Sequence, residues 1–146
     1  MSRHRLFNPE ELAPAVGFSY GAVAGDGRLL HLAGITGHHA DGSIDADVVE
    51  QFAVACRSVS TVIAAAGGEP TDLVSMMIYT PDIAGYRASL EPLGHVYRGV
   101  FGRHYPSMAL IGVSELFDPS ALVELVCVAV VPDGALQSSS TKTVSS

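Results

Sequence analysis

One helix in the sequence has both of its ends marked, and it limits which folds the chain can adopt. Residues 47–50 are DVVE, a capping box in which Asp47 starts the helix and Glu50 lies three residues on. Apolar residues follow at a spacing of three to four, and Gly67-Gly68 is typical of a helix C-terminus. The apolar run LVSMMIYT, at 73–80, comes directly afterwards. A helix that leads into a buried strand predicts a fold that combines helices with a sheet.

The segments before this helix predict a lead-in and two strands. Residues 1–15 are polar and contain prolines, which is typical of an irregular lead-in. Two strands are expected within 17–36, joined at 24–27 (AGDG), because Asp-Gly supplies the positive φ that tight hairpins need. The second strand, RLLHLAGI, is almost wholly apolar and suits a strand that is covered on both faces.

The segment after the buried strand predicts a second helix with an interruption. Its apolar residues favour a helix from Ile83 or Tyr86 to about Phe101. Pro92 and Gly94 lie inside this range, so the helix is expected to be kinked or split in two there.

The C-terminal third predicts two further strands and a tail. MALIGVSEL at 108–116 and ALVELVCVAVV at 121–131 are expected to form a final strand pair joined at 117–120. Residues 133–146 are rich in Ser and Thr without periodicity, which predicts a flexible tail. The order β-β-α-β-α-β-β within 16–132 therefore predicts one α+β domain, with a mixed sheet and two helices on one face.

The composition indicates that this domain does not stand alone. Apolar residues make up 48% of the 146 residues and charged residues only 16%, which leaves little charge to cover the surface. Large apolar patches on a single domain usually mark interfaces. The composition therefore favours an oligomer.

Charge and residue spacing exclude several classes of function. The net charge is −7 and the eight basic residues are scattered, unlike the clustered Lys and Arg of a nucleic-acid-binding surface. No membrane span is expected, because no apolar run reaches 18 residues. No signal peptide is expected either, because MSRHRLF is followed by NPEE and not by an apolar stretch, so the cytoplasm is the expected location. Cys56 and Cys127 lie in apolar segments and are expected to be buried free thiols. The adjacent His38 and His39 have no third ligand at metal-binding spacing, so no metal site is expected.

Two residues of the last strands each allow two interpretations. Glu124 is the one charge in ALVELVCVAVV, where a carboxylate is costly unless it is paired or reaches water. It belongs either to a strand edge or subunit rim, or to a cleft in which its pKa is perturbed. Met108 follows the turn Tyr105-Pro106-Ser107 at the start of a strand. It is either a core residue or part of a site at the mouth of the sheet.

Several stretches of the chain resemble one known family in their order and spacing. They are AGIT at 33–36, AAAGG at 64–68, DLVSMMIYTPDIAGY at 72–86, and YPS-x-ALIGVSELFDPSALVELVCVAVV at 105–131. From about Val16 to Val131 the chain resembles the RidA (YjgF) family of reactive intermediate, or enamine/imine, deaminases.

This resemblance implies a fold, an assembly and a chemistry. The fold is chorismate-mutase-like, and the assembly is a homotrimer whose sheets line a central barrel, with three clefts between adjacent subunits. Deaminases of this family hydrolyse small enamines or imines derived from amino acids, such as 2-aminoacrylate, to 2-keto acids and ammonia. They use no metal or organic cofactor, so none is expected here. The expected partners are a small-molecule substrate and further copies of the chain.

Compared residue by residue, the chain keeps only part of the family's site. The carboxylate-binding arginine of a Pro-small-Arg pattern is replaced by Met108, which removes a bidentate clamp. In the last strand Glu124 keeps the first of two acidic residues, whereas Val126 replaces the second. The family's tyrosine near the first strand falls at Ser19, or at Tyr20 with a shift of one residue. Glu124 and Tyr20 are the expected catalytic residues. The other expected substrate-binding residues are a strand end and an aromatic residue of the second helix: Gly34, Ile35, Thr36 and Tyr86.

Two functions remain open on these residues. The first is an enzyme that acts on a small reactive imine or enamine lacking the usual carboxylate. The second is a non-catalytic trimer that binds a small ligand or a protein partner. Endoribonuclease, a label sometimes attached to the family, is disfavoured by the acidic charge balance.

Overall fold

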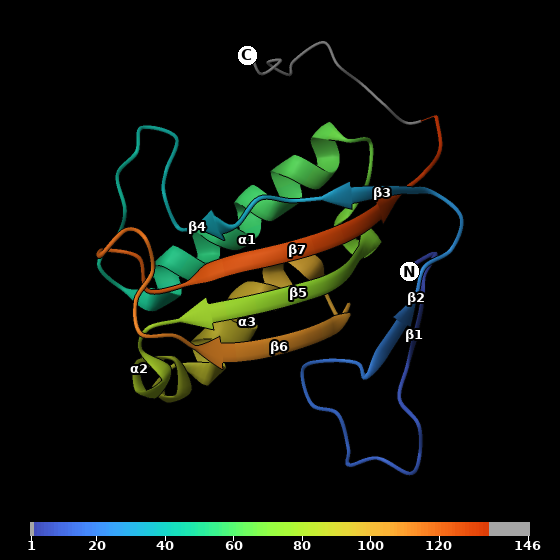
Figure 1. Ribbon diagram of the computed structural model, residues 1–146, viewed down its shortest axis with the longest axis horizontal. Coiled ribbons are helices and arrows are strands. Elements are labelled where there is room, and N and C mark those ends of the chain that lie inside the picture. The colour runs from blue at the N-terminus through green and yellow to red at the C-terminus, as the bar shows by residue number, and fades with distance from the viewer. Residues whose placement is uncertain (1, 135–146) are drawn as a thin grey trace.

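A five-stranded mixed sheet with its helices on one face dominates the computed structural model, which describes residues 2–134 (Figure 1). The strand order is β3-β7-β5-β6, and β4 also pairs with β7. Strands β5 and β6 are parallel, whereas the other pairs are antiparallel. The strands are β3 (Arg28–His31), β4 (Ile35–Thr36), β5 (Leu73–Thr80), β6 (Ser107–Gly112) and β7 (Glu124–Val131). This is the predicted α+β architecture with a mixed sheet. The tail expected at 133–146 lies almost wholly outside the described residues.

Helix α1 (Val48–Ala65) has the start and the end that the sequence predicts. The Asp47 carboxylate accepts hydrogen bonds from the backbone N–H groups of Val49 and Glu50, which satisfies two donors of the first turn. Within residues 2–134, α1 is long and apolar enough to cross a membrane by length and composition alone. Seven of its residues are buried in the fold, among them Gln51, which is the burial expected of a core helix.

The second predicted helix is split in two, but not where expected. Helix α2 (Ile83–Ala88) ends at Ser89, which is also the N-cap residue of α3 (Leu90–Phe101). Pro92 therefore lies in the first turn of α3, where its missing N–H leaves no intrahelical hydrogen bond unmade. Both helices lie on the same side of the sheet as α1 (Figure 1).

The core lies between the sheet and the helices. On this side of β7 the side chains of Leu125, Cys127 and Ala129 are buried, in the alternation that a strand produces. Both cysteines are buried and free, as predicted, and burial raises the pKa of the Cys127 thiol to about 12.

The predicted hairpin within 17–36 is wrong. Strand β2 (Gly21–Val23) pairs with a strand in the expected lead-in, β1 (Arg5–Phe7), in a separate two-stranded sheet, and β3 pairs with β7. The linking segment packs against its surroundings instead of closing a turn. A Cβ on Gly25 would lie 2.9 Å from the Arg3 carbonyl oxygen, and one on Gly27 would meet the backbone of Val131.

The final strands are also not a pair, because β5 lies between them. Strand β6 pairs with β5 in parallel, and β7 pairs with the other edge of β5 in antiparallel. The predicted strand 108–116 ends at Gly112, and the strand of the last segment starts at Glu124. The intervening loop is longer than the two to five residues of most hairpin turns, so it can cross over β5.

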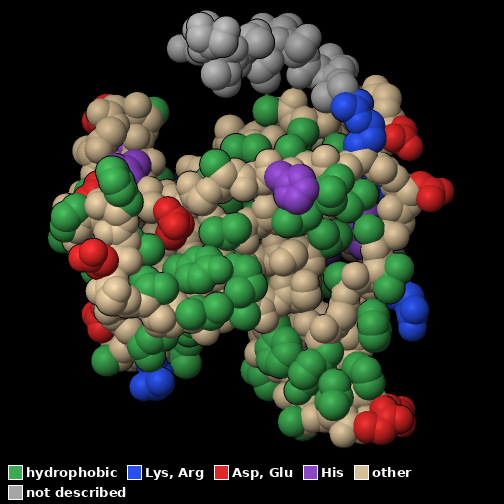
Figure 2. Space-filling model, in the orientation of Figure 1, with side chains coloured by type: hydrophobic (Ala, Val, Ile, Leu, Met, Phe, Trp, Pro, Cys, Tyr) green, Lys and Arg blue, Asp and Glu red, His purple; other side chains and the backbone are tan. Residues whose placement is uncertain are grey.

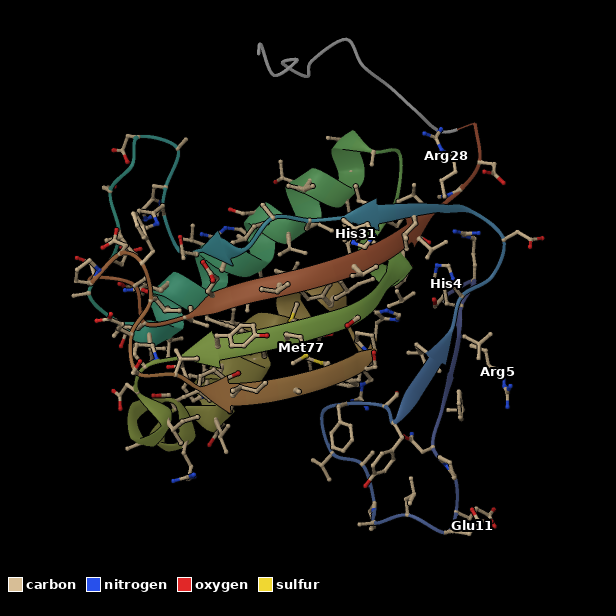
Figure 3. The ribbon with its side chains drawn as sticks, in the orientation of Figure 1. His4, Arg5, Glu11, Arg28, His31 and Met77 are labelled. Atoms are coloured by element: carbon tan, nitrogen blue, oxygen red, sulfur yellow. The ribbon has the colours of Figure 1, made fainter. Side chains whose placement is uncertain are left out.

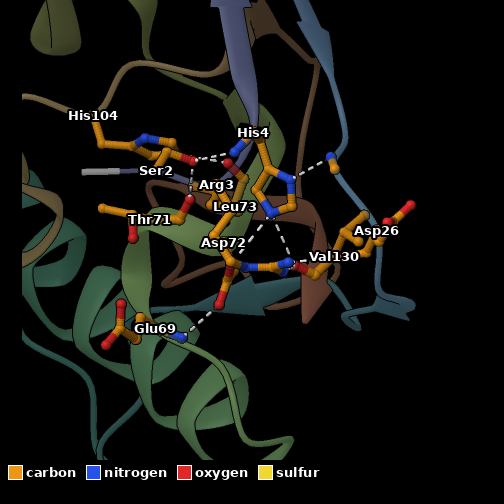
Figure 4. Close-up of polar contacts among 11 residues, drawn as sticks. Ser2, Arg3, His4, Asp26, Glu69, Thr71, Asp72, Leu73, His104 and Val130 are labelled. Atoms are coloured by element: carbon orange, nitrogen blue, oxygen red, sulfur yellow. Dashed lines mark hydrogen bonds and ion pairs between the residues drawn. The ribbon is translucent and has the colours of Figure 1, made fainter. Parts of the chain in front are cut away.

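The N-terminal arm is fixed to the sheet by a buried histidine (Figure 4). His4 Nδ1 accepts a hydrogen bond from the Gly25 backbone N–H, so the proton lies on Nε2. His4 Nε2 donates to Asp72 Oδ1 at 3.2 Å and to the Val130 carbonyl at 2.9 Å. Arg3 forms an ion pair with the same carboxylate. Further along, Glu11 lies at the far tip of the loop between β1 and β2 (Figure 3).

Candidate functional site

The predicted site residues lie on opposite faces of the sheet. Met108 is in register with Met76 of β5, and Met76 is in register with Cys127, so Met108 belongs to the face that the helices cover. Glu124 is in register with Thr36 and with Tyr79, whose side chains belong to the other, outer face. Within a single chain, therefore, Met108 and Glu124 do not share a pocket.

Met108 lines a cavity on the helix side of the sheet. The cavity has a volume of about 470 Å³, and its lining includes Phe18, Phe52, Tyr86, Leu93, Tyr97 and Met108. Tyr86 is buried with its ring edge-to-face against Phe52, and desolvation raises the pKa of its hydroxyl to about 12. Met108 is half-buried and also packs on the core. The side chain thus has both roles that the sequence left open: it contacts the core and it lines a cavity.

Glu124 lines a second pocket, at the end of β7 on the outer face. This pocket has a volume of about 440 Å³ and is lined by Gly34, Thr36, His38, Phe117, Asp118, Pro119 and Glu124. A Cβ on Gly34 would lie 3.0 Å from the carboxyl carbon of Glu124. The missing Cβ at Gly34 therefore leaves room for the Glu124 carboxylate against this backbone. The strand-end glycine and the lone carboxylate of the sequence are neighbours in the structure.

Three further polar side chains of this pocket form a hydrogen-bonded chain. His38 Nε2 lies 2.7 Å from Asp118 Oδ2, and the Thr36 hydroxyl lies 2.5 Å from His38 Nδ1. A carboxylate can only accept, so Nε2 carries the proton and Nδ1 accepts from the Thr36 hydroxyl. The Ser120 backbone N–H and His38 both bind Asp118, and they hold the pKa of its carboxyl below the usual value.

Sequence reasoning missed His38 and Asp118. From the sequence, His38 was considered only as a metal ligand, yet its side chain turns back to bind the Thr36 hydroxyl two residues before it. Asp118 is 80 residues away from His38 along the chain, so no local spacing could reveal the pair. The one local signal was the Asp-Pro-Ser turn at 118–120, in which Asp118 accepts from the Ser120 N–H.

Besides Met108, Tyr86 and Val126, three further predicted residues do not line this pocket. Ser19 is buried, and its hydroxyl donates to the Tyr105 carbonyl at 2.5 Å, which fixes the segment beside β6. The Tyr20 ring is 39% exposed and packs edge-to-face on Phe18. Ile35 is in register with Leu125, so it faces the helices rather than the outer pocket.

The rest of the outer face is mostly apolar. Figure 2 shows a broad hydrophobic area over the middle of the sheet, and Figure 3 places Met77 within it, with His31 on the neighbouring part of β3. Val126 is in register with Met77 and belongs to this area. Leu29 is 63% exposed and Ile111 39% exposed at its two sides. The polar pocket thus lies at one end of an unusually apolar sheet face.

No metal cluster is present in residues 2–134: no group of three or more His, Cys, Asp and Glu side chains there could hold an ion. The donor set of the outer pocket is one imidazole with two carboxylates on different elements, and the imidazole is already bound on both nitrogens.

The family model described as Endoribonuclease L-PSP matches residues 9–131. The chain belongs to this family. It is the Rid, or YjgF, family that the sequence resembles, and the match spans the five-stranded sheet, the helices and both pockets. No curated protein sequence matches the chain significantly.

Solved structures of Rid proteins have the same fold. The chain is 28% identical to YyfB, a Rid-family protein of unknown function from Yersinia pestis, with a TM-score of 0.79 over 88% of this chain and 98% of the other. It is 28% identical to a YjgF/YER057c/UK114 family member from Mycobacterium tuberculosis, with a TM-score of 0.59 over 88% and 99% of the two chains. A putative endoribonuclease from Thermotoga maritima, 19% identical over 84% and 91%, shares the fold with a TM-score of 0.62.

Proposed function

We propose that this Rid protein hydrolyses a small reactive imine or enamine that lacks the carboxylate of amino-acid-derived substrates. The observation that carries the proposal is the contact between Gly34 and Glu124 in the outer pocket, because it keeps a carboxylate at the strand end where the resemblance expects one. A carboxylate there attracts the cationic, protonated form of an imine, which is the form that water attacks most readily.

The change of substrate follows from Met108. A thioether cannot pair with a substrate carboxylate, and losing a charge-assisted bidentate contact removes roughly 1.5–3 kcal/mol, or about 10- to 100-fold in binding. Met108 lines a cavity whose walls, within residues 2–134, are mostly aromatic and aliphatic, with Arg98 as the one charged residue of the lining. Such a wall favours a neutral or apolar substituent on the imine.

The separation of Met108 and Glu124 supports a site between subunits. The two residues lie on opposite faces of one sheet, so a cleft that contains both needs two copies of the chain. The apolar outer face and the exposed Leu110 and Ile111 of the edge strand β6 are suited to burial in such an assembly. We therefore propose a homotrimer with clefts between adjacent subunits, in which residues 16–132 of each chain form a single domain and which acts in the cytoplasm.

The alternative is a trimer that binds a small ligand or a protein without catalysis. The half-exposed outer pocket and the apolar helix-side cavity would serve this function as well. Ribonuclease activity, which the family description names, is not favoured, because the net charge of −7 opposes binding to a phosphate backbone.

Imines generated in situ test this proposal. An amine oxidase makes acetaldimine from ethylamine and benzaldimine from benzylamine, and an amino-acid oxidase makes 2-iminopropionate from alanine. We expect the protein to accelerate ammonia release from the first two and to leave 2-iminopropionate near its spontaneous rate. Efficient turnover of 2-iminopropionate contradicts the altered substrate, and turnover of none of the three favours the binding function.

The variant Met108→Arg sharpens the same test. If Met108 faces a hydrated cleft in the assembly, the variant folds, assembles as the wild type does and gains turnover of 2-iminopropionate. Loss of folding or assembly would instead make Met108 a core residue. Size-exclusion chromatography with light scattering reports the assembly, and thermal unfolding reports the fold.

A further inference from the structure

The chain Thr36–His38–Asp118 is the feature of the outer pocket that the resemblance does not account for. Each link is a short hydrogen bond, at 2.5 Å and 2.7 Å, and both ring nitrogens of His38 are used. At one end of this hydrogen-bonded series is Thr36, which lines the pocket and is paired in register with Glu124. His38 is only part-exposed, with 30% of its side-chain surface accessible.

We propose that His38 is the proton acceptor of this pocket, positioned by Asp118 and acting on substrate water through the Thr36 hydroxyl. The inference rests on the proposed function for the identity of the substrate, and it assigns the step that this function leaves without a base. The Asp118 carboxylate keeps the Nε2–H tautomer, so Nδ1 is the basic nitrogen and is directed at Thr36.

The proton balance closes for hydrolysis of an iminium ion. Water attacks the carbon of C=NH₂⁺ and the C=N π pair moves to nitrogen. The water proton passes to Thr36 Oγ1 while the Thr36 proton passes to His38 Nδ1, which leaves a neutral carbinolamine and an imidazolium. The imidazolium then returns its proton through Thr36 to the amine. Ammonia departs as the hydroxyl of the carbinolamine becomes a protonated carbonyl, whose proton goes to the ammonia. The sum is an iminium ion and water converted to a carbonyl compound and ammonium.

Glu124 supplies the charge that this sequence needs. Glu124 of β7 is paired in register with Thr36 of β4, and both residues line the same pocket. An iminium nitrogen bound beside the carboxylate would therefore present its carbon to water near the Thr36 hydroxyl. The carboxylate stabilises the cation before attack, and His38 takes the proton that attack releases. The two groups therefore have separate tasks.

The neighbouring histidine is a matched control. His39 Nε2 lies 2.8 Å from Asp45 Oδ2, so it forms a histidine–aspartate pair of nearly the same length. Its side chain is 41% exposed, and His39 is not among the residues that line the outer pocket. If an imidazole–carboxylate pair alone were enough, both pairs would have the same effect on turnover.

The experiment compares His38→Gln with His39→Gln in the full chain, with acetaldimine as substrate. We expect His38→Gln to lower kcat/KM by about 100-fold, within the range of general-base catalysis, and His39→Gln to change it less than about twofold. Thr36→Val should lower it as His38→Gln does, and Thr36→Ser should restore most of it. Equal activity of wild type and His38→Gln overturns the proposal and leaves the proposed function intact.

Asp118 acts through His38, so its test uses a pH profile. Asp118→Asn removes the carboxylate that fixes the Nε2–H tautomer of His38, so the acidic limb of the kcat/KM profile should change, whereas Asp45→Asn should leave it in place. An unchanged limb in both variants overturns the positioning role.

A second substrate separates failure of the base from failure of the proposed function. Hydrolysis of 4-nitrophenyl acetate needs a base at the pocket but no imine chemistry. One outcome is that no imine is turned over, while wild type and His39→Gln hydrolyse this ester and His38→Gln does not. In that case the proposed function is wrong, and the assignment of His38 as the base is supported. If His38→Gln hydrolyses the ester as fast as the wild type, the base fails.

Discussion

Two histidine–aspartate pairs in this protein consist of the same two residue types but lie in different surroundings. In the first, His4 and Asp72 lie 3.2 Å apart, the His4 side chain is 0% exposed, and Nδ1 accepts from a backbone N–H. In the second, His38 and Asp118 lie 2.7 Å apart, His38 is 30% exposed, and Nδ1 accepts from a hydroxyl that lines a pocket. Such a pair is structural when backbone groups bind both ring nitrogens, as at His4, and it is available for chemistry when one nitrogen binds a hydroxyl that lines a pocket, as at His38.

Removing the carboxylate of Asp72 or of Asp118 should distinguish a role in stability from a role in activity. The buried Asp72 should have the larger effect on the free energy of unfolding. Asp72→Ala removes the carboxylate that His4 and Arg3 share and leaves the Glu69 N–H unpaired, so we expect a loss of about 3 kcal/mol in the free energy of unfolding. Asp118→Ala should leave the urea midpoint close to that of the wild type, since its side chain is 37% exposed. Equal losses of stability in the two variants would contradict the distinction.

The imidazoles give the next largest difference. His4→Gln removes the link between the arm, Asp72 and Val130, and should cost about 1–3 kcal/mol of stability, because buried polar groups lose partners. The folded His4→Gln protein should keep the wild-type kcat/KM for acetaldimine. Urea unfolding and the kinetic assay, measured on one preparation, check both expectations. A drop in kcat/KM at wild-type stability would place His4 in the chemistry instead.

A smaller change should disturb the pocket without touching His38. Gly34→Ala places a methyl group 3.0 Å from the carboxyl carbon of Glu124, so the carboxylate must move by a few tenths of an ångström. We expect kcat/KM to fall about tenfold and stability to change by less than about 1 kcal/mol. Gly42→Ala is not a suitable control, because Gly42 has φ +88°, whereas Gly99→Ala meets nothing within 4 Å. Unchanged activity in Gly34→Ala would remove Glu124 from the site.

The sequence allowed the elements with local signals to be predicted. The first helix begins at Asp47 and the following strand spans Leu73–Thr80, because a side-chain cap and an apolar run bounded by Pro81 determine them. Glu124 could be singled out for the same reason, as one charge in an apolar strand. The strand-end Gly34 was predicted as a substrate-binding residue, and in the structure it lies against the Glu124 carboxylate.

What could not be predicted depends on contacts between distant residues. Strand β2 pairs with β1 of the N-terminal arm, and the arm is held in place by the contact between His4 and Asp72, 68 residues apart in the sequence. The Asp-Gly turn signal therefore gave a wrong hairpin. Strand β6 pairs in parallel with β5, so the loop after Gly112 must cross β5 before the chain reaches β7, and no local signal predicts this pairing. The base of the pocket needs His38 and Asp118, which no spacing connects.

A third histidine extends the comparison to pH and has the smallest expected effect. His104 is buried and donates through Nε2 to the Leu73 carbonyl at 2.7 Å, without a carboxylate as its direct partner. Desolvation lowers the pKa of His104 below the ordinary 6.5, although the Leu73 carbonyl opposes part of this shift. The unfolded chain therefore binds a proton at His104 more readily than the folded chain does. Stability contributed by neutral His104 is fully present above pH 6.5 and is lost as the pH falls from there through the lowered pKa. In urea titrations between neutral and mildly acidic pH, His104→Gln should flatten this dependence, because its amide can still donate to Leu73 but does not titrate. A slope unchanged by this substitution would assign the acid sensitivity to other groups.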